Sequence, residues 1–142
     1  MAKKRILVLG GGFAGVDCTR KLESYFYSDY DIEITLVSDD NFLLFTPMLP
    51  QVVAGTITPR HIVMPLRALC KKSRIYESVV RDIDPIQQYV TLEGTPEKIG
   101  IRIHYDYLVI ALGSKTNFFG LNDVEKNSFT MKTLADAISL RN

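Results

Sequence analysis

The stretch Gly10-Gly11-Gly12-Phe13-Ala14-Gly15 decides the fold of this 142-residue chain. It satisfies the pattern G-x-G-x-x-G, which is weak evidence by itself because glycines are common. Its context strengthens it, since the apolar run at residues 6–9 predicts a strand and the spacing from residue 13 to about 27 predicts a helix. A strand that enters a helix through spaced glycines is typical of a phosphate-binding turn.

The three spaced glycines have separate physical tasks in such a turn. Gly10 permits the tight bend, Gly12 lets a pyrophosphate approach the backbone, and Gly15 lets the helix pack closely on the strand. The amino terminus of the helix then offers N–H groups and a partial positive charge to the phosphates. The alternative is a tight strand-to-helix turn without any ligand.

A second predicted strand at residues 32–37 completes a strand–helix–strand unit. Dinucleotide-binding turns usually have an acidic residue at the end of this strand, where it binds ribose hydroxyls. Ser38 occupies that position here, and Asp39 could serve after a shift of one residue; alternatively, Asp39 and Asp40 only form a solvated turn. No basic residue stands here, so nothing supports a ribose 2′-phosphate.

The middle of the chain is less regular. Residues 42–49 are apolar, but Pro47 and Pro50 exclude an ordinary long helix. Helical spacing returns over residues 60–72, with Pro65 near a helix start, and residues 75–83 and 89–92 predict strands.

The last part of the chain predicts a return to the sheet. Ile101 and Ile103 alternate with polar residues, which is the period of a half-exposed antiparallel strand. Residues 108–112 are wholly apolar and predict a buried parallel strand. Thr133 and Asp136 could cap a final helix. The prediction is therefore one α/β domain over residues 1–142, a Rossmann-like parallel sheet with helices and a small antiparallel insertion.

Composition narrows the classes of function. The chain is 46% hydrophobic, and its 17 basic and 16 acidic residues give a net charge of +1, which excludes intrinsic disorder and favours no nucleic-acid partner. No apolar run reaches the roughly 18 residues of a membrane helix. Cys18 and Cys70 are too few for a disulfide scaffold and suit a reducing compartment, so we expect a cytoplasmic protein.

Three further segments resemble the type II NADH:quinone oxidoreductases, which are single-subunit NADH dehydrogenases. They are Phe42-Leu43-Leu44-Phe45-Thr46-Pro47-Met48-Leu49, Tyr105-Asp106-Tyr107-Leu108-Val109-Ile110-Ala111-Leu112-Gly113-Ser114, and Phe129-Thr130-Met131-Lys132-Thr133-Leu134-Ala135-Asp136-Ala137. The Phe-Thr-Pro segment is the most specific, whereas Ala-Leu-Gly-Ser is shared across the two-dinucleotide-binding-domain flavoproteins. The resemblance covers essentially the whole chain. It implies that the chain corresponds to the FAD-binding amino-terminal part of such an enzyme.

The resemblance implies which residues lie near FAD. The glycine turn would contact the pyrophosphate, Ser38 and Asp39 would lie near the adenosine ribose, and the flavin ring would lie against Thr46-Pro47. The backbone of a later strand would meet the adenine, and small residues near residue 112 would let the returning strand pass the cofactor. The full set is Gly10, Gly12, Phe13, Ala14, Gly15, Ser38, Asp39, Thr46, Pro47, Val80, Ala111 and Gly113.

The implied activity is that of a flavin-dependent NAD(P)H:quinone oxidoreductase. Hydride would pass from NADH to FAD, and electrons would then pass to quinone. We name no acid, base or nucleophile as catalytic, and neither His61 nor His104 has a partner at metal-ligand spacing, so we expect no metal site. The full-length enzyme would lie peripherally on the cytoplasmic face of a membrane, and we also consider a homodimer.

Alternatives remain at this stage. Sulfide:quinone or ferredoxin-type FAD oxidoreductases share the scaffold, although Cys18 and Cys70 lack the close spacing of a disulfide reductase. The chain could also be a nucleotide-binding module without turnover. It carries one G-x-G-x-x-G motif rather than the two that FAD and NADH need, so we expect a truncated domain, without its NADH-binding domain and carboxyl-terminal part, that is inactive alone.

Overall fold

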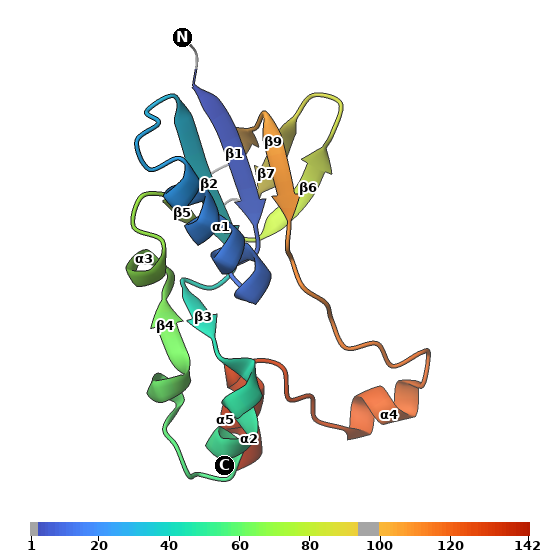
Figure 1. Cartoon of the computed structure of the whole chain (residues 1–142). Coiled ribbons are helices and arrows are strands. Elements are labelled where there is room, and N and C mark those ends of the chain that lie inside the picture. Colours follow the sequence, from blue (N-terminus) through green and yellow to red (C-terminus); the bar gives the residue numbers. More distant parts are fainter. Residues whose placement is uncertain (1–2, 94–99) are drawn as a thin grey trace. The chain divides into compact units, whose positions relative to one another are not determined.

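The computed structural model describes residues 3–93 and 100–142 and groups them into two compact units (Figure 1). The first unit consists of Met1–Leu43 and Pro65–Gly113, and the second consists of Leu44–Met64 and Ser114–Asn142. Each unit has its own core.

A four-stranded parallel sheet forms the centre of the first unit. Strand β1 (Lys4–Leu9) pairs in parallel with β2 (Ile32–Ser38) on one side and with β9 (Tyr107–Ile110) on the other, and β2 pairs in parallel with β5 (Arg74–Glu77). The strand order is β5-β2-β1-β9. Helix α1 (Phe13–Tyr25) joins β1 to β2, so the predicted strand–helix–strand unit is confirmed.

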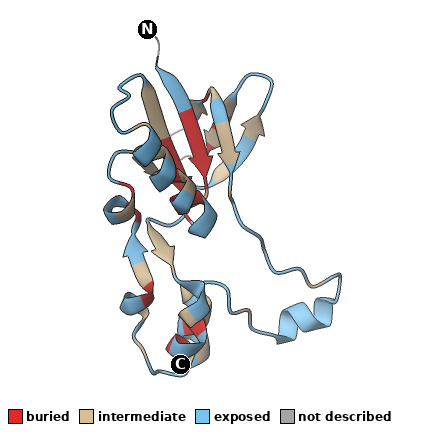
Figure 2. Ribbon diagram, in the orientation of Figure 1, coloured by how far each residue is buried: buried red, intermediate tan, exposed pale blue. Residues whose placement is uncertain are grey.

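Both faces of this sheet are covered, which explains the unbroken apolar runs. Side chains alternate along β1, so Leu7 and Leu9 pack in one core cluster while Val8 packs in the other with Val16 of α1. None of the three strand residues is more than 1% exposed. Figure 2 shows this buried section in the carboxyl-terminal half of β1. Full burial of each such side chain contributes roughly 1.5–3 kcal/mol.

A three-stranded antiparallel sheet packs on one of these faces. It contains β6 (Val80–Asp84), β7 (Tyr89–Leu92) and β8 (Arg102–His104), in that order. The core cluster that holds Leu7 and Leu9 also holds residues of β7. The predicted antiparallel insertion is confirmed.

The prediction of one strand over residues 75–83 is wrong, because the chain changes sheets in the middle of that stretch. The Ser78 N–H donates to the Ser38 carbonyl of the parallel sheet (2.8 Å), whereas the Val79 carbonyl accepts from the Glu93 N–H (2.8 Å). An apolar run shows that a segment is buried but does not show which strand it pairs with.

The predicted helix over residues 60–72 is also wrong. The chain instead forms a 3₁₀ turn, η2 (Pro59–Ile62), a short strand, β4 (Val63–Pro65), and one helical turn, α3 (Leu66–Leu69). Proline lacks an N–H group and disfavours helical geometry in the residue before it, so Pro65 separates strand from helix. Strand β4 pairs with β3 (Phe42–Leu44) in a two-stranded sheet.

Strand β9 returns to the parallel sheet as predicted, but it is only partly buried: Leu108 and Val109 pack on the two core clusters, whereas the end of the strand is exposed. Ile110 is 63% exposed and Leu112 is 53% exposed. The reason is its place at the edge, since among the described residues β9 pairs only with β1. An apolar sequence therefore predicted the sheet correctly and the burial only in part.

The second unit is helical. A small core of Leu49, Val52, Ile62 and Ala137 lies where its helices meet, and Figure 1 shows α2 and α5 side by side. The elements are η1 (Thr46–Met48), α2 (Leu49–Val53), η2, α4 (Asn122–Asn127) and α5 (Leu134–Arg141). In the part of the chain that the structure describes, no helix has the length and apolar character needed to cross a bilayer.

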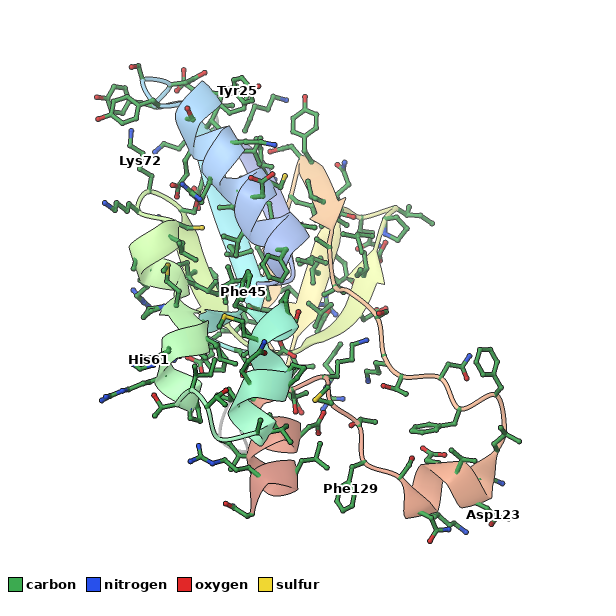
Figure 3. All side chains as sticks on the ribbon, turned by 60° about the horizontal axis from the view of Figure 1, so that its bottom comes forward. Tyr25, Phe45, His61, Lys72, Asp123 and Phe129 are labelled. Carbon is green, nitrogen blue, oxygen red and sulfur yellow. The ribbon has the colours of Figure 1, made fainter. Side chains whose placement is uncertain are left out.

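Glu23 of α1 holds the loop that leads into β5 through hydrogen bonds. Its carboxylate accepts hydrogen bonds from the backbone N–H groups of Lys71 (3.2 Å), Lys72 (2.9 Å) and Ser73 (2.7 Å), and from the Ser73 hydroxyl (2.8 Å). Lys72 reaches the end of the same helix (Figure 3), where its ammonium group donates to the Tyr27 carbonyl (2.8 Å). One carboxylate thus satisfies three backbone donors of a tight loop.

We expect Glu23→Ala to lower the free energy of unfolding by about 1–3 kcal/mol, because it leaves these donors without their acceptor. Urea unfolding of the whole chain measures this. Asp17→Asn on the same helix is the matched control, since it removes only the exposed pair with Lys21 (2.9 Å) and should cost less than about 0.5 kcal/mol. Equal losses in the two variants would contradict the role of Glu23.

A capping box begins α5, as the sequence predicted. The Asp136 N–H donates to the Thr133 hydroxyl (3.1 Å), and the Asp136 carboxylate accepts from the Thr133 N–H (3.0 Å). The carboxylate also accepts from the Lys132 N–H (2.9 Å) and the Thr130 hydroxyl (3.0 Å). These donors, the Lys132 and Thr133 N–H groups foremost, hold the pKa of the Asp136 carboxyl below its ordinary value.

A depressed pKa in the folded state means that Asp136 stabilises the chain above the pKa of the unfolded carboxyl, about 4, and that this contribution is lost as the pH falls through the folded pKa. We therefore expect Asp136→Asn to have a lower melting temperature than the wild type at pH 7. Near pH 2 the two melting temperatures should become equal. Melting curves between these pH values measure the difference. Asp123→Asn in α4 is the control. A difference in melting temperature between Asp136→Asn and the wild type that does not change with pH would contradict a stabilising role of the Asp136 carboxylate.

Candidate functional site

The backbone of the glycine turn passes directly against the end of β9. The Gly10 N–H donates to the Val37 carbonyl (2.7 Å), and the Ala111 N–H donates to the Leu9 carbonyl (2.8 Å). Gly10 has φ +108°, and a Cβ atom there would lie 2.2 Å from the Ala111 carbonyl oxygen. Only glycine fits both this conformation and this contact.

Gly15 lets α1 lie against the same turn. A Cβ atom on Gly15 would be 1.8 Å from the Gly10 carbonyl oxygen and 3.6 Å from the Ala111 Cβ. One turn later, the buried Thr19 hydroxyl donates to the Gly15 carbonyl (2.8 Å). The predicted packing task of Gly15 thus corresponds to a close approach of two backbones in the structure.

Gly12 differs from both, because the space beside it is open. A Cβ atom on Gly12 would meet no heavy atom within 4 Å, and Gly12, Phe13 and Ala14 are all exposed. Gly12 is the N-cap of α1, no side chain caps this end, and no acidic residue lies in the first turn. This exposed rim at the positive end of a helix suits the phosphates of a dinucleotide.

Gly11 was missed as a site residue. It is buried, and a Cβ atom there would lie 2.3 Å from the Ser38 Oγ and 3.0 Å from a Leu66 methyl group. The turn therefore rests on the end of β2 at this point. The only signal in the sequence was a third glycine at a position where the motif accepts any residue.

Ser38 lies under the glycine turn. Asp39, Val80 and Gly113, which were also predicted to lie near FAD, have different surroundings. Asp39 is exposed, and its carboxylate accepts from the Asp40 N–H (3.1 Å). Val80 begins β6, and its side chain packs on the core. Gly113 follows β9 with φ +74°.

Thr46 and Pro47 lie in the second unit, not in the unit that holds the glycine turn. They are the first two residues of η1, and both are exposed. Their expected role beside a flavin ring therefore rests on the resemblance alone.

Cys70 does not have the character of a redox centre. Cys70 is buried in the core against α1, and this burial raises the pKa of its thiol to about 11, so the thiol stays protonated at neutral pH. Cys18 is half-buried, and both cysteines are free. Among residues 3–93 and 100–142, no three His, Cys, Asp or Glu side chains are placed to hold a metal ion.

We expect Gly15→Ala to destabilise the chain by about 2 kcal/mol or more, because the added methyl group meets backbone that cannot rotate away. Gly12→Ala should change the stability by less than about 1 kcal/mol, since its methyl group enters open space. Urea unfolding of both variants without ligand measures the contrast. Equal effects would show that the close approach at Gly15 is not required.

Comparisons with known proteins agree with this geometry. The family model for pyridine nucleotide-disulphide oxidoreductases matches residues 4–142. The mitochondrial external NADH-ubiquinone oxidoreductase 2 of Saccharomyces cerevisiae is 31% identical over 99% of this chain, and external alternative NAD(P)H-ubiquinone oxidoreductase B1 of Solanum tuberosum is 34% identical over 98%. The chain spans 26% and 25% of their lengths, or about a quarter.

Solved structures show the same relationship. NDH2 of Plasmodium falciparum in complex with NADH is 27% identical with a TM-score of 0.84, covering 98% of this chain and 28% of its own. The sulfide:quinone oxidoreductase of Aquifex aeolicus is 33% identical, also with a TM-score of 0.84, over 97% of this chain and 30% of its own. The Rossmann-like class and the resemblance to NADH:quinone oxidoreductases are thereby confirmed, and the chain belongs to the pyridine nucleotide-disulphide oxidoreductase family.

Proposed function

We propose that this chain is the FAD-binding part of a flavin-dependent NAD(P)H:quinone oxidoreductase. The observation that carries the proposal is the open space beside Gly12, at the uncapped start of α1 and at the carboxyl end of a parallel sheet. Ligands of open α/β sheets bind outside the carboxyl ends of the strands. The names of the relatives supply the choice of a NAD(P)H and ubiquinone enzyme.

In this proposal the residues of the first unit hold the adenosine diphosphate half of FAD. Gly10 and Gly15 shape the turn, while the exposed backbone at Gly12, Phe13 and Ala14 binds the pyrophosphate. Ala111 and Gly113 have little or no side chain, so the returning strand can pass close to the cofactor. Ser38 and Asp39 lie toward the ribose, and the backbone of Val80 contacts the adenine. Thr46 and Pro47 are assigned to the flavin ring.

The activity of the whole enzyme extends the proposal. A bound flavin accepts hydride from a nicotinamide and passes electrons to an acceptor, and the protein supplies position and electrostatics. Quinone as acceptor implies a peripheral enzyme at a membrane surface, which we assign to the cytoplasmic face, and we extend the proposal to a homodimer. Since the chain carries one G-x-G-x-x-G motif, we infer that it binds a nucleotide without turnover on its own.

Sulfide is the second candidate substrate, because the Aquifex aeolicus sulfide:quinone oxidoreductase shares the fold at 33% identity. Sulfide oxidation on this scaffold would need redox-active cysteines. Cys70 is buried and protonated and does not fit that role. The chain covers only 30% of the Aquifex aeolicus enzyme, so Cys70 does not decide between the two substrates, and the names of the curated relatives favour NAD(P)H.

We expect the purified chain to bind FAD, seen as a flavin spectrum or as quenching of flavin fluorescence on titration, and to bind it more tightly than NADH. Gly12→Ala should weaken FAD binding at least roughly 10-fold while leaving the urea midpoint unchanged, because its methyl group occupies the phosphate space. Preference for NADH over FAD, or unaltered FAD binding by Gly12→Ala, would contradict the proposal.

A further inference from the structure

The carboxyl ends of β2 and β5 lie side by side at the edge of the sheet where the proposed site lies. Ser38 and Glu77 are partners in the parallel register of these strands. Two residues earlier, Leu36 and Ile75 pack in the core cluster that contains Val16 of α1. Because alternate residues share a face, Ser38 and Glu77 also belong to the face that α1 covers.

Ser38 cannot supply the carboxylate expected at the end of the second strand. The residue is only 4% exposed, and its hydroxyl has no hydrogen-bond partner within the part of the chain that the structure describes. Its Oγ would lie 2.3 Å from a Cβ atom on Gly11, so the hydroxyl points at the underside of the glycine turn. Among the described residues no fully buried side-chain oxygen lacks a partner, so the Ser38 Oγ still reaches solvent and is available to a polar ligand group.

Glu77 is both oriented and accessible. The Asn41 side-chain amide donates to the Glu77 Oε2 (3.2 Å), whereas the Oε1 atom has no partner among the described residues. Glu77 and Asn41 line a hollow of about 300 Å³ on this edge, together with Pro65, Arg67 and Ile75. A carboxylate with one oxygen held and one free is suited to accept hydrogen bonds from vicinal hydroxyl groups.

The neighbouring carboxylates make this edge electronegative. Partial burial, then the charges of Asp39 and Glu77, raise the pKa of the Asp40 carboxyl above its usual value. Asp39 itself accepts the Asp40 N–H in a local turn. Arg67 lines the same hollow and offsets part of this charge. The assignment of a ribose diol therefore rests on the geometry of Glu77 and not on the field of the edge.

We propose that Glu77, with the Ser38 hydroxyl beside it, recognises the adenosine ribose diol of the bound dinucleotide, and that Asp39 does not. This inference rests on the proposed FAD site and names the residue that contacts the ribose hydroxyl groups.

Two matched variants, Glu77→Ala and Asp39→Ala, test the assignment because each removes one carboxylate from the same edge. Calorimetric titration of the whole chain would use FAD, ADP and 2′,3′-dideoxy-ADP. We expect Glu77→Ala to weaken FAD and ADP roughly 10-fold and to abolish the preference for ADP over its dideoxy analogue. Asp39→Ala should stay within about twofold of the wild type. The urea midpoint of each variant separates lost binding from lost folding, and Glu77→Gln, which keeps the shape, should fall between wild type and Glu77→Ala.

The outcomes distinguish the two proposals. A wild-type chain that binds neither FAD nor ADP overturns the proposed function and this inference together. A wild type that binds FAD while Glu77→Ala retains the same affinity and the same preference for ADP overturns only the assignment of Glu77. A larger loss in Asp39→Ala than in Glu77→Ala would move the ribose contact to Asp39.

Discussion

Three backbone segments meet at the glycine turn with no side chain between them: the end of β1, the start of α1 and the residue that follows β9. The contact at Gly15, where a single methyl group would lie 1.8 Å from the Gly10 carbonyl, shows how little room there is. Because backbone atoms cannot rotate out of the way, this constraint fixes the angle at which the helix leaves the sheet. The central strand can then be covered by α1 on one face and by the antiparallel sheet on the other.

The same constraint separates structural glycines from the binding surface. Gly10, Gly11 and Gly15 face protein, whereas Gly12 faces open space at the amino end of α1. A turn that needed glycine only for its own conformation would not require one at the open position. The geometry thus gives a physical reason to expect a ligand that approaches the backbone closely. Because a helix amino terminus attracts anions, we expect the approaching group to be a phosphate.

Much of this was predictable from local patterns. The apolar run in β1, the glycine spacing and the alternation around Ile103 each reflect geometry within a few residues. The strands and the strand–turn–helix unit that they predict are confirmed, whereas the phosphate site stays a prediction. The predictions failed where a pattern was compatible with several partners. The stretch around Ser78 is divided between two sheets. A helix does start after Pro65, as predicted, but it is the single turn α3, and residues 60–65 form a 3₁₀ turn and a strand.

The sequence by itself determined the strand–turn–helix unit, because glycine conformation and side-chain periodicity act over short distances along the chain. The glycine spacing also indicated a dinucleotide, and the resemblance to a family of flavoproteins indicated FAD. Only the tertiary structure decided that Ser38 lies beneath Gly11 and beside Glu77, because these contacts depend on the parallel register of β2 and β5. Residues far apart in the sequence meet only when strands pair, and no local pattern encodes that pairing.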